Sequence, residues 1–322
     1  MHTFTYEKPM STDKAVLANG RFIAGGTTLV DLMKLGVEEP PKLVDVTGLP
    51  LAQIEKLPNG GLLIGATVRN SDLAHDPTVM ADYAVLSEAL LSGASPQLRN
   101  MATTGGNLLQ RTRCPYFRDP SAGGCNKREP GSGCSAIEGH HRMMAILGTS
   151  EKCIATHPSD MCVALTALEA TIHIQGVKGK RTVAIGDFYK LPGDTPNIEN
   201  VLESGDLITH VELPPPTKGS KQVYLKLRDR ASYEFALSSA AVVAEVSGGH
   251  IKSVRIAMGG VGTRPWRSHE AEAALKGKAA TPANFRTAAE AALKGAKTHP
   301  ENAFKVELAK RCVTRALKMA TA

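Results

Sequence analysis

Four cysteines in one glycine-rich and basic stretch are the residues of this sequence best suited to redox or metal chemistry. They are Cys114, Cys125, Cys134 and Cys153, and all lie within residues 111–153. The intervals of 10, 8 and 18 residues between them match neither the paired C-x2-C of a zinc ribbon nor the tight ferredoxin run. The stretch therefore predicts an inserted set of metal ligands, but its spacing alone does not name the metal.

Two further cysteines fall on predicted helices at apolar positions. Cys162 and Cys312 are expected to be buried thiols. Cys162 is the main rival to Cys153 as the fourth ligand. Disulfides are disfavoured because the chain begins without a secretory signal, although export together with a partner would weaken that argument.

A glycine pair stands between a predicted strand and a predicted helix near the N-terminus. Gly25 and Gly26 are followed by Thr27 and Thr28, before apolar residues recur at helical spacing from Leu29. Backbone N–H groups in such a loop can converge on an anion, which suits a pyrophosphate. The segment fits neither G-x-G-x-x-G nor the P-loop. A simple tight turn is the alternative interpretation.

The same chemistry recurs in a second loop, where Thr103 and Thr104 precede Gly105, Gly106 and Asn107. Two such loops on different lobes could hold a long dinucleotide from both sides. After the cysteine stretch, Ser159 and Asp160 open a helix. Asp160 is either part of the helix cap or an acceptor for ligand hydroxyls.

Hydrophobic periodicity and turn residues give the order of the elements. The first lobe reads as a strand at 4–6, a helix from Ser11 to the Asn19–Gly20 turn, a strand at 21–24, a helix at 29–36 and a strand at 43–46. The second lobe has strands at 62–66, 170–174 and 207–213 with helices at 83–91 and 160–170. Pro214–Pro216 is a plausible boundary. Beyond it, β-rich segments at 222–227, 235–246 and 251–259 precede helices at 270–275, 288–293 and 304–319.

Composition narrows the class of protein. The 322 residues are 42% hydrophobic and 21% charged, which is typical of a globular protein, and no apolar run approaches the roughly 20 residues of a membrane span. The net charge of +7 is spread along the chain without a nucleic-acid-binding motif. We expect no nucleic-acid partner and no membrane insertion. Without its own signal peptide the chain is cytoplasmic by default, with periplasmic co-export beside a twin-arginine partner as the alternative.

These motifs, in this order, resemble the FAD-binding medium subunit of the molybdenum hydroxylase (xanthine dehydrogenase) family, over nearly the whole chain. The resemblance rests on residues 24–29, 103–107, 159–160, 206–208 and 224–226. The insertion is similar to the one in the branch of bacterial periplasmic aldehyde oxidoreductase and 4-hydroxybenzoyl-CoA reductase.

The resemblance implies an α+β fold. A two-lobed FAD-binding domain of the p-cresol methylhydroxylase type would cover residues 1–213, with lobes of about 1–53 and 54–213 and an iron–sulfur insertion at 111–153. A smaller flavoprotein C-terminal α+β domain would cover residues 217–322.

The resemblance also implies the site residues. The FAD pyrophosphate would be held by Ala24, Gly25, Gly26, Thr27, Thr28 and Leu29. The second lobe would contribute Thr103, Thr104, Gly105, Gly106 and Asn107, with Ala94 and Ser95 nearby. Asp160 would bind ribityl or ribose hydroxyls, Ile208 would pack near the adenine, and Lys226 would lie near the isoalloxazine ring. Cys114, Cys125, Cys134 and Cys153 would hold a [4Fe–4S] cluster, with zinc as the alternative.

The implied function is electron transfer. A large molybdenum-cofactor subunit would oxidise an aldehyde, a small [2Fe–2S] subunit would pass the electrons on, and this chain would deliver them from FAD to an external acceptor, in a heterotrimer or its dimer. We expect no residue of this chain to act on the organic substrate. One alternative is a self-sufficient FAD-dependent reductase, but the sequence offers no convincing acid–base pair for it. The other is a zinc-stabilised interaction module.

Overall fold

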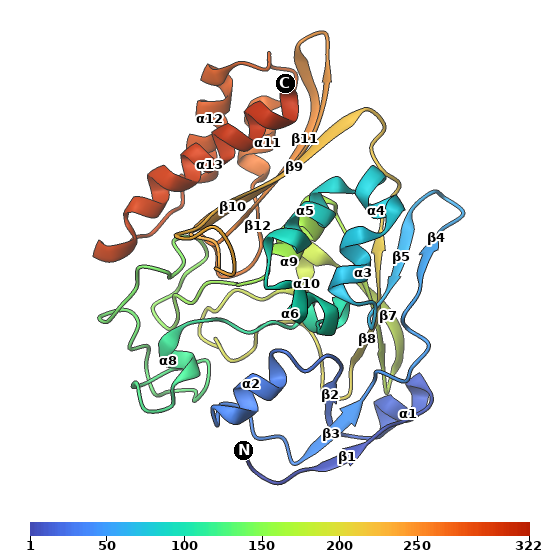
Figure 1. The fold of residues 1–322 in the computed structure, drawn as a ribbon. Coiled ribbons are helices and arrows are strands. Elements are labelled where there is room, and N and C mark those ends of the chain that lie inside the picture. Colours follow the sequence, from blue (N-terminus) through green and yellow to red (C-terminus); the bar gives the residue numbers. More distant parts are fainter.

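A computed structural model describes residues 1–322 and contains three β-sheets with helices packed around them (Figure 1). The N-terminal sheet is parallel, in the order β1 (Thr5–Glu7), β3 (Lys42–Asp45), β2 (Arg21–Ile23). Its connections are α1 (Thr12–Leu17) and α2 (Leu29–Lys34). Ser11 caps α1 by accepting a hydrogen bond from the Lys14 amide at 3.3 Å. The alternation of strand and helix predicted for this region is confirmed.

The central sheet is antiparallel and has five strands. Their order is β4 (Ile54–Lys56), β5 (Leu62–Gly65), β8 (Leu207–Leu213), β6 (Thr171–Gly176), β7 (Gly179–Ala184). β5 and β8 pair directly although about 140 residues separate them in the chain. The cysteine stretch lies in the long connection between β5 and β6, two strands of this one sheet. The chain from β5 onward carries α3 (Asn70–His75), α4 (Pro77–Asp82), α5 (Ala84–Ser92), α6 (Pro96–Met101), α7 (Thr104–Leu108), α9 (Asp160–Ala167) and α10 (Ile185–Phe188).

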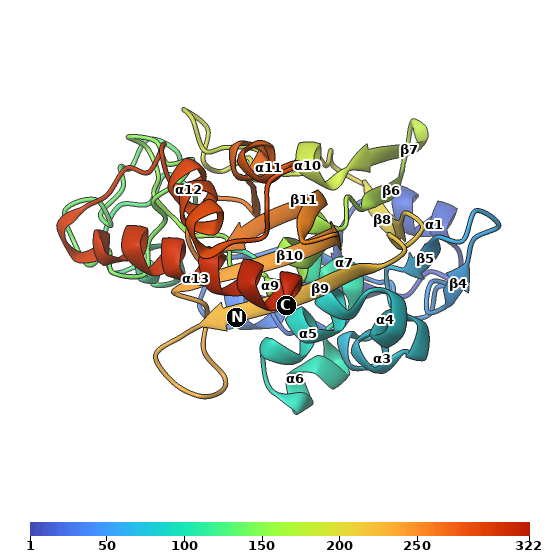
Figure 2. The ribbon, with the colours of Figure 1, turned by 90° about the horizontal axis from the view of Figure 1, so that it is seen from above.

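The C-terminal sheet is antiparallel, in the order β12 (Trp266–Arg267), β11 (His250–Gly259), β10 (Ser238–Ser247), β9 (Ser220–Leu227). Figure 2 shows the last helices over one face of it, while α5 and α9 pack on the other. These last helices are α11 (His269–Leu275), α12 (Pro282–Ala292) and α13 (Phe304–Thr321), with a 3-10 turn at Pro300–Asn302. Because both faces are covered, the inner strand β10 is buried from Ser238 to Ala244, and the five residues Ala240–Ala244 are all apolar. The predicted α+β class is confirmed.

No helix of the chain, α13 included, combines the length and the apolar character needed to cross a bilayer.

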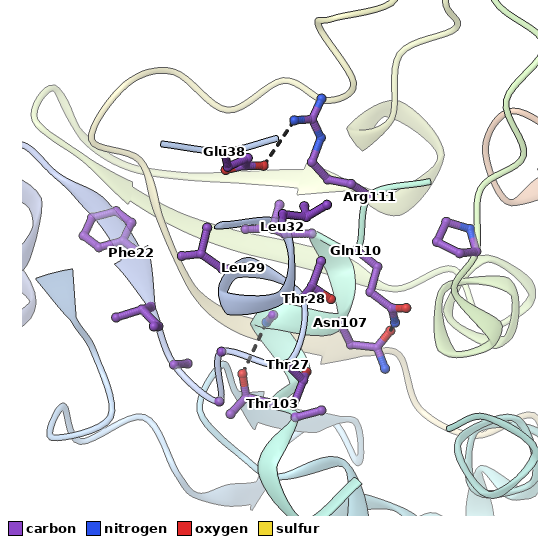
Figure 3. A pocket seen from close by; sticks show the side chains of 18 of the residues that line it. Phe22, Thr27, Thr28, Leu29, Leu32, Glu38, Thr103, Asn107, Gln110 and Arg111 are labelled. Atoms are coloured by element: carbon purple, nitrogen blue, oxygen red, sulfur yellow. Dashed lines mark hydrogen bonds and ion pairs between the residues drawn. The ribbon is translucent and has the colours of Figure 1, made fainter. Parts of the chain in front are cut away.

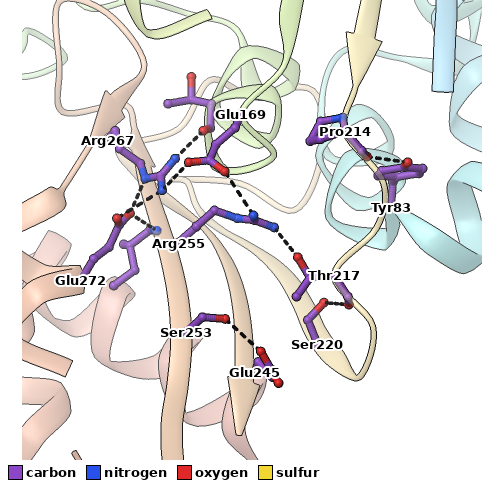
Figure 4. Close-up of polar contacts among 12 residues, drawn as sticks. Tyr83, Glu169, Pro214, Thr217, Ser220, Glu245, Ser253, Arg255, Arg267 and Glu272 are labelled. Carbon is purple, nitrogen blue, oxygen red and sulfur yellow. Dashed lines mark hydrogen bonds and ion pairs between the residues drawn. The ribbon is translucent and has the colours of Figure 1, made fainter. Parts of the chain in front are cut away.

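Polar contacts tie the central part of the chain to the C-terminal sheet (Figure 4). Tyr83 donates its hydroxyl hydrogen to the carbonyl of Pro214 at 2.8 Å, at the start of the proline-rich linker. Arg255 and Arg267, both on the C-terminal sheet, pair with Glu169 at 3.2 and 3.3 Å. The apolar core beneath is shared as well, since Tyr224 and Ala241 belong to the same buried cluster as Leu62 and Ile172.

The cysteine stretch contains one short helix, α8 (Pro115–Arg118), and is otherwise built of turns. Arg128 organises the turns, because its guanidinium donates to the carbonyls of Phe117 at 3.1 Å and Gly123 at 2.9 Å. The end of the stretch is fixed to the C-terminal part of the chain by Lys305. This fully buried ammonium donates to the carbonyls of Met143, Met144 and Gly260 at 2.7–3.0 Å, so its buried charge is satisfied.

Candidate functional site

A cavity of about 1030 Å³ lies between the N-terminal lobe, at β2 and α2, and helices and loops of the later parts of the chain (Figure 3). Its walls come from the β2–α2 loop, the region of α6 and α7, the start of α9, and loops at 197–206 and 230–235. Pockets for small ligands span roughly 300–1,000 Å³. This cavity is therefore large enough for a ligand of dinucleotide size.

The β2–α2 loop presents unpaired backbone donors to this cavity. All residues from Ala24 to Leu29 line it. The amides of the four residues from Gly25 to Thr28 donate no hydrogen bond to any backbone or side-chain acceptor of the chain. Gly26 has φ +69°, a left-handed conformation that turns the loop and favours glycine. Unpaired N–H groups in a loop that lines a cavity can bind an anion such as a pyrophosphate.

Gly25 also lets the two lobes approach each other. A Cβ built on it would lie 1.8 Å from the carbonyl oxygen of Met101 and 2.6 Å from its carbonyl carbon. Both of these atoms are backbone and cannot swing aside. The first glycine pair is therefore a point of close packing between lobes as well as a donor loop.

The opposite wall is built on α7. Thr103 caps this helix by accepting from the Gly106 amide at 3.3 Å. The side-chain oxygen of Asn107 accepts from Gln110 at 2.5 Å and from the Ser159 hydroxyl at 2.6 Å. Its amide nitrogen donates to nothing within the chain and Asn107 lines the cavity, so a ligand acceptor can use this donor.

Asp160 and Lys226 form a buried ion pair on the cavity wall. The Lys226 ammonium lies 2.7 Å from Asp160 Oδ2, and the two side chains are 3% and 10% exposed. Lys226 also donates to the Ser92 carbonyl at 3.1 Å, and the Tyr224 hydroxyl donates to Asp160 Oδ1 at 2.6 Å. Burial raises the pKa of Tyr224 well above its usual value. The neutral phenol is therefore a fixed donor that orients the carboxylate.

The structure brings most of the predicted cofactor residues to this one cavity. Its lining includes Ala24, Gly25, Gly26, Thr27, Thr28, Leu29, Ala94, Thr103, Gly106, Asn107, Asp160 and Lys226. Four others lie outside the lining. Ser95 caps α6, and the Thr104 hydroxyl donates a hydrogen bond to the Val68 carbonyl. Gly105 packs against Ala66, and Ile208 lies in the central hydrophobic core.

Sequence reasoning did not select several charged and aromatic residues of the lining, among them Glu38, Arg99, Arg111, Glu199 and Phe235. They reach the cavity from loops or helix ends that carry no motif. One signal was present, because residues 228–235 cluster charged and aromatic side chains after a strand, a composition typical of functional loops.

All four cysteines of the insertion line a second, much smaller cavity, together with Phe117 and Lys127. Burial raises the pKa of Cys114 to about 12 and also raises those of Cys134 and Cys153, so a metal would have to displace thiol protons on binding. No three His, Cys, Asp or Glu side chains are arranged to hold a metal ion in this structure. Cys162 lies elsewhere, 3.1 Å from the Tyr189 hydroxyl.

Comparison with known proteins identifies the family. Residues 3–216 match the family described as the FAD binding domain in molybdopterin dehydrogenase, and residues 223–320 match the CO dehydrogenase flavoprotein C-terminal domain. The aldehyde oxidoreductase FAD-binding subunit PaoB of Escherichia coli K12 is 51% identical over 332 aligned residues, covering 100% of this chain and 99% of that one. The glyceraldehyde dehydrogenase medium chain of Sulfolobus acidocaldarius is 30% identical, covering 81% of this chain and 74% of that one.

Solved structures agree with these matches. A chain of the carbon monoxide dehydrogenase of Hydrogenophaga pseudoflava superposes with a TM-score of 0.77 at 28% identity, covering 99% of this chain and 97% of that one. A chain of quinoline 2-oxidoreductase from Pseudomonas putida 86 gives a TM-score of 0.76 at 25% identity, with the same coverage. The chain therefore belongs to the family of FAD-binding medium subunits of the molybdenum hydroxylases, which are oxidoreductases.

Proposed function

We propose that this chain binds FAD in the large cavity and a [4Fe–4S] cluster at its four clustered cysteines, as the electron-transfer subunit of a molybdenum-dependent aldehyde oxidoreductase. The observation that carries the flavin site is the row of four unpaired amides at Gly25–Thr28, facing Thr103 and Asn107 across a cavity of about 1030 Å³. Bound FAD would supply the redox chemistry, and the protein would bind, orient and shield it.

The chain's own groups define the expected orientation of FAD. The amides of Gly25–Thr28 would hold the pyrophosphate, and the Asn107 amide would donate from the other wall. Both oxygens of Asp160 already accept a hydrogen bond, from Tyr224 and Lys226. A carboxylate has further lone pairs, so Asp160 can still accept from ribityl or ribose hydroxyls while its direction stays fixed. The Asp160–Lys226 pair leaves little net charge at this wall.

The cluster assignment rests on the shared cavity of the cysteines. Cys114, Cys125, Cys134 and Cys153 all line it, and Cys162 does not, which supports Cys153 as the fourth ligand. A cubane cluster bonds each thiolate to a different iron, so its ligands stand farther apart than those of a single ion. The absence of a preformed single-ion site is therefore compatible with a cluster. Lys127 beside the cavity would offset part of the cluster's negative charge.

We propose the partners and the direction of electron flow on the basis of the family. A large molybdenum-cofactor subunit would oxidise the aldehyde and a small [2Fe–2S] subunit would deliver electrons to this chain, which would pass them to an external acceptor. The 51% identity to an aldehyde oxidoreductase subunit over the whole chain supports an aldehyde as the substrate of the complex.

We also propose the domain division 1–213 and 217–322, with lobes of about 1–53 and 54–213 in the first part. The separate sheets on either side of Pro214–Pro216 support it. The shared core of Tyr224 and Ala241 with the central sheet indicates that the two parts are firmly docked.

Cofactor analysis of the purified chain tests the proposal. Denaturation should release FAD, and the variants Cys114→Ser, Cys125→Ser and Cys134→Ser should each lose iron and acid-labile sulfide while retaining at least part of their flavin. Cys312→Ser is a matched control, because Cys312 is a buried thiol in α13 far from the cysteine cavity. A chain without flavin would refute the central assignment, and zinc in place of iron would refute the cluster.

A further inference from the structure

We propose that Lys127, Glu199 and Arg111 form an ion-pair chain that couples the two cavities, so that assembly of the cluster and binding of FAD strengthen each other. This inference rests on the proposed function and deepens it. Lys127 lines the cysteine cavity, and Glu199 and Arg111 line the large cavity.

The geometry of the chain is continuous. The Lys127 ammonium lies 2.7 Å from Glu199 Oε1, and Arg111 Nε lies 2.6 Å from Glu199 Oε2. One carboxylate therefore joins a cation at the cysteine cavity to a cation at the large cavity. Arg111 continues to Glu38 of the first lobe at 3.1 Å (Figure 3).

The chain is shielded from solvent. The side chains of Lys127, Glu199 and Arg111 are 11%, 25% and 18% exposed. Charges shielded in this way are weakly screened and keep their partners, whereas an exposed pair contributes little. Lys127 is held further by donating to the Pro196 carbonyl at 3.0 Å, so it fixes the loop that carries Glu199 at two points.

A second contact runs beside the ion pairs. The Arg111 guanidinium lies over the Phe117 ring, 4.4 Å from its centroid, and Phe117 is fully buried on the wall of the cysteine cavity. Arg111, the first residue of the insertion, therefore contacts Phe117 within the insertion, Glu38 of the first lobe and Glu199 of the 197–206 loop at once. A change in the packing of the cysteine cavity must act on this side chain.

The consequence for binding follows from the position of Lys127. It lies two residues after Cys125, so fixing the Cys125 thiolate on a cluster fixes Lys127 as well. Glu199 and Arg111 are then fixed in the wall of the large cavity, in the positions in which FAD would contact them. By linkage, FAD binding must stabilise the cluster to the same extent.

A double-mutant cycle tests the coupling. The dissociation constant of FAD is measured on the flavin-depleted full chain for wild type, Lys127→Met, Cys125→Ser and the double variant. Each single change should raise this constant about tenfold, and the double variant should stay near tenfold, because both changes remove the same coupling. Glu199→Gln, placed away from the cysteines, should reproduce Lys127→Met and also speed iron loss to a chelator.

The control is Asp229→Asn. This change breaks another ion pair of the insertion, between Arg142 and Asp229. The two side chains are 48% and 47% exposed, and neither lines the large cavity. This variant should bind FAD as wild type does. Independent effects that multiply to about a hundredfold in the double variant, or unchanged FAD affinity in both Lys127→Met and Glu199→Gln, would overturn the coupling while leaving the proposed function standing. A wild-type chain without FAD or iron would overturn the proposed function itself.

Discussion

Replacing Gly25 by alanine should separate the two lobes at the flavin cavity. The added Cβ would lie 1.8 Å from the Met101 carbonyl oxygen, about 1.6 Å short of an ordinary contact. Since both partners are backbone, the β2–α2 loop or the α6 end must move. Overpacking of this kind costs about 1–3 kcal/mol. Because the four donor amides begin at Gly25, we expect FAD affinity to fall by about ten- to a hundredfold.

The assay is titration of the flavin-depleted chain with FAD, followed by the quenching of flavin fluorescence, with thermal unfolding measured in parallel. Gly186→Ala is the matched control, because a Cβ at Gly186 meets no atom within 4 Å and its φ is ordinary. Gly25→Ala should bind FAD more weakly than Gly186→Ala at equal protein concentration. If the two variants bind FAD equally and unfold together, the close approach of the lobes does not shape the site.

Two further predictions concern buried charge. Lys226→Met leaves the Asp160 carboxylate buried without its ammonium partner and should lower the free energy of unfolding by about 3–5 kcal/mol. The control Lys252→Met breaks an exposed pair with Glu245 and should change this free energy by less than about 1 kcal/mol. Equal effects of the two variants in urea unfolding would contradict the burial of the Asp160–Lys226 pair. Burial lowers the pKa of His157 to about 4, so the unfolded chain takes up this proton first as the pH falls. The pKa of His157 in the unfolded chain is about 6.5, so the free energy of unfolding should be about 2 kcal/mol lower at about pH 5 than at about pH 7.5. His157→Phe should abolish this part of the decrease. The same pH dependence in wild type and His157→Phe would refute the prediction.

Local sequence signals determined much of this fold. The Ser11 cap and the apolar spacing after Leu29 predicted α1 and α2 within a few residues. The helix expected at 288–293 begins earlier in the structure, at Pro282, because Thr281 caps it and proline suits a first helical position. Both residues are adjacent in the sequence and together mark the true start of this helix.

Long-range pairing could not be predicted in the same way. The Asp160–Lys226 ion pair joins the start of α9 to β9, and neither residue's neighbours in sequence indicate the other. Glu199 lies in a loop with no regular element, yet it joins the two cavities. Ala94 adopts φ 52°, a left-handed conformation rare for alanine, that only the packed structure imposes. The motifs therefore indicated the ligand class, and the tertiary contacts determine how the walls are held.

The most direct test of the account is to count flavin, iron and acid-labile sulfide in one anaerobically purified sample of the full chain and in its Cys125→Ser variant. We predict about one FAD and about four iron and four sulfide per wild-type chain, with the iron and sulfide lost in the variant and the FAD retained in part. A wild-type chain that contains no FAD, or whose iron content is the same in the Cys125→Ser variant, would contradict it.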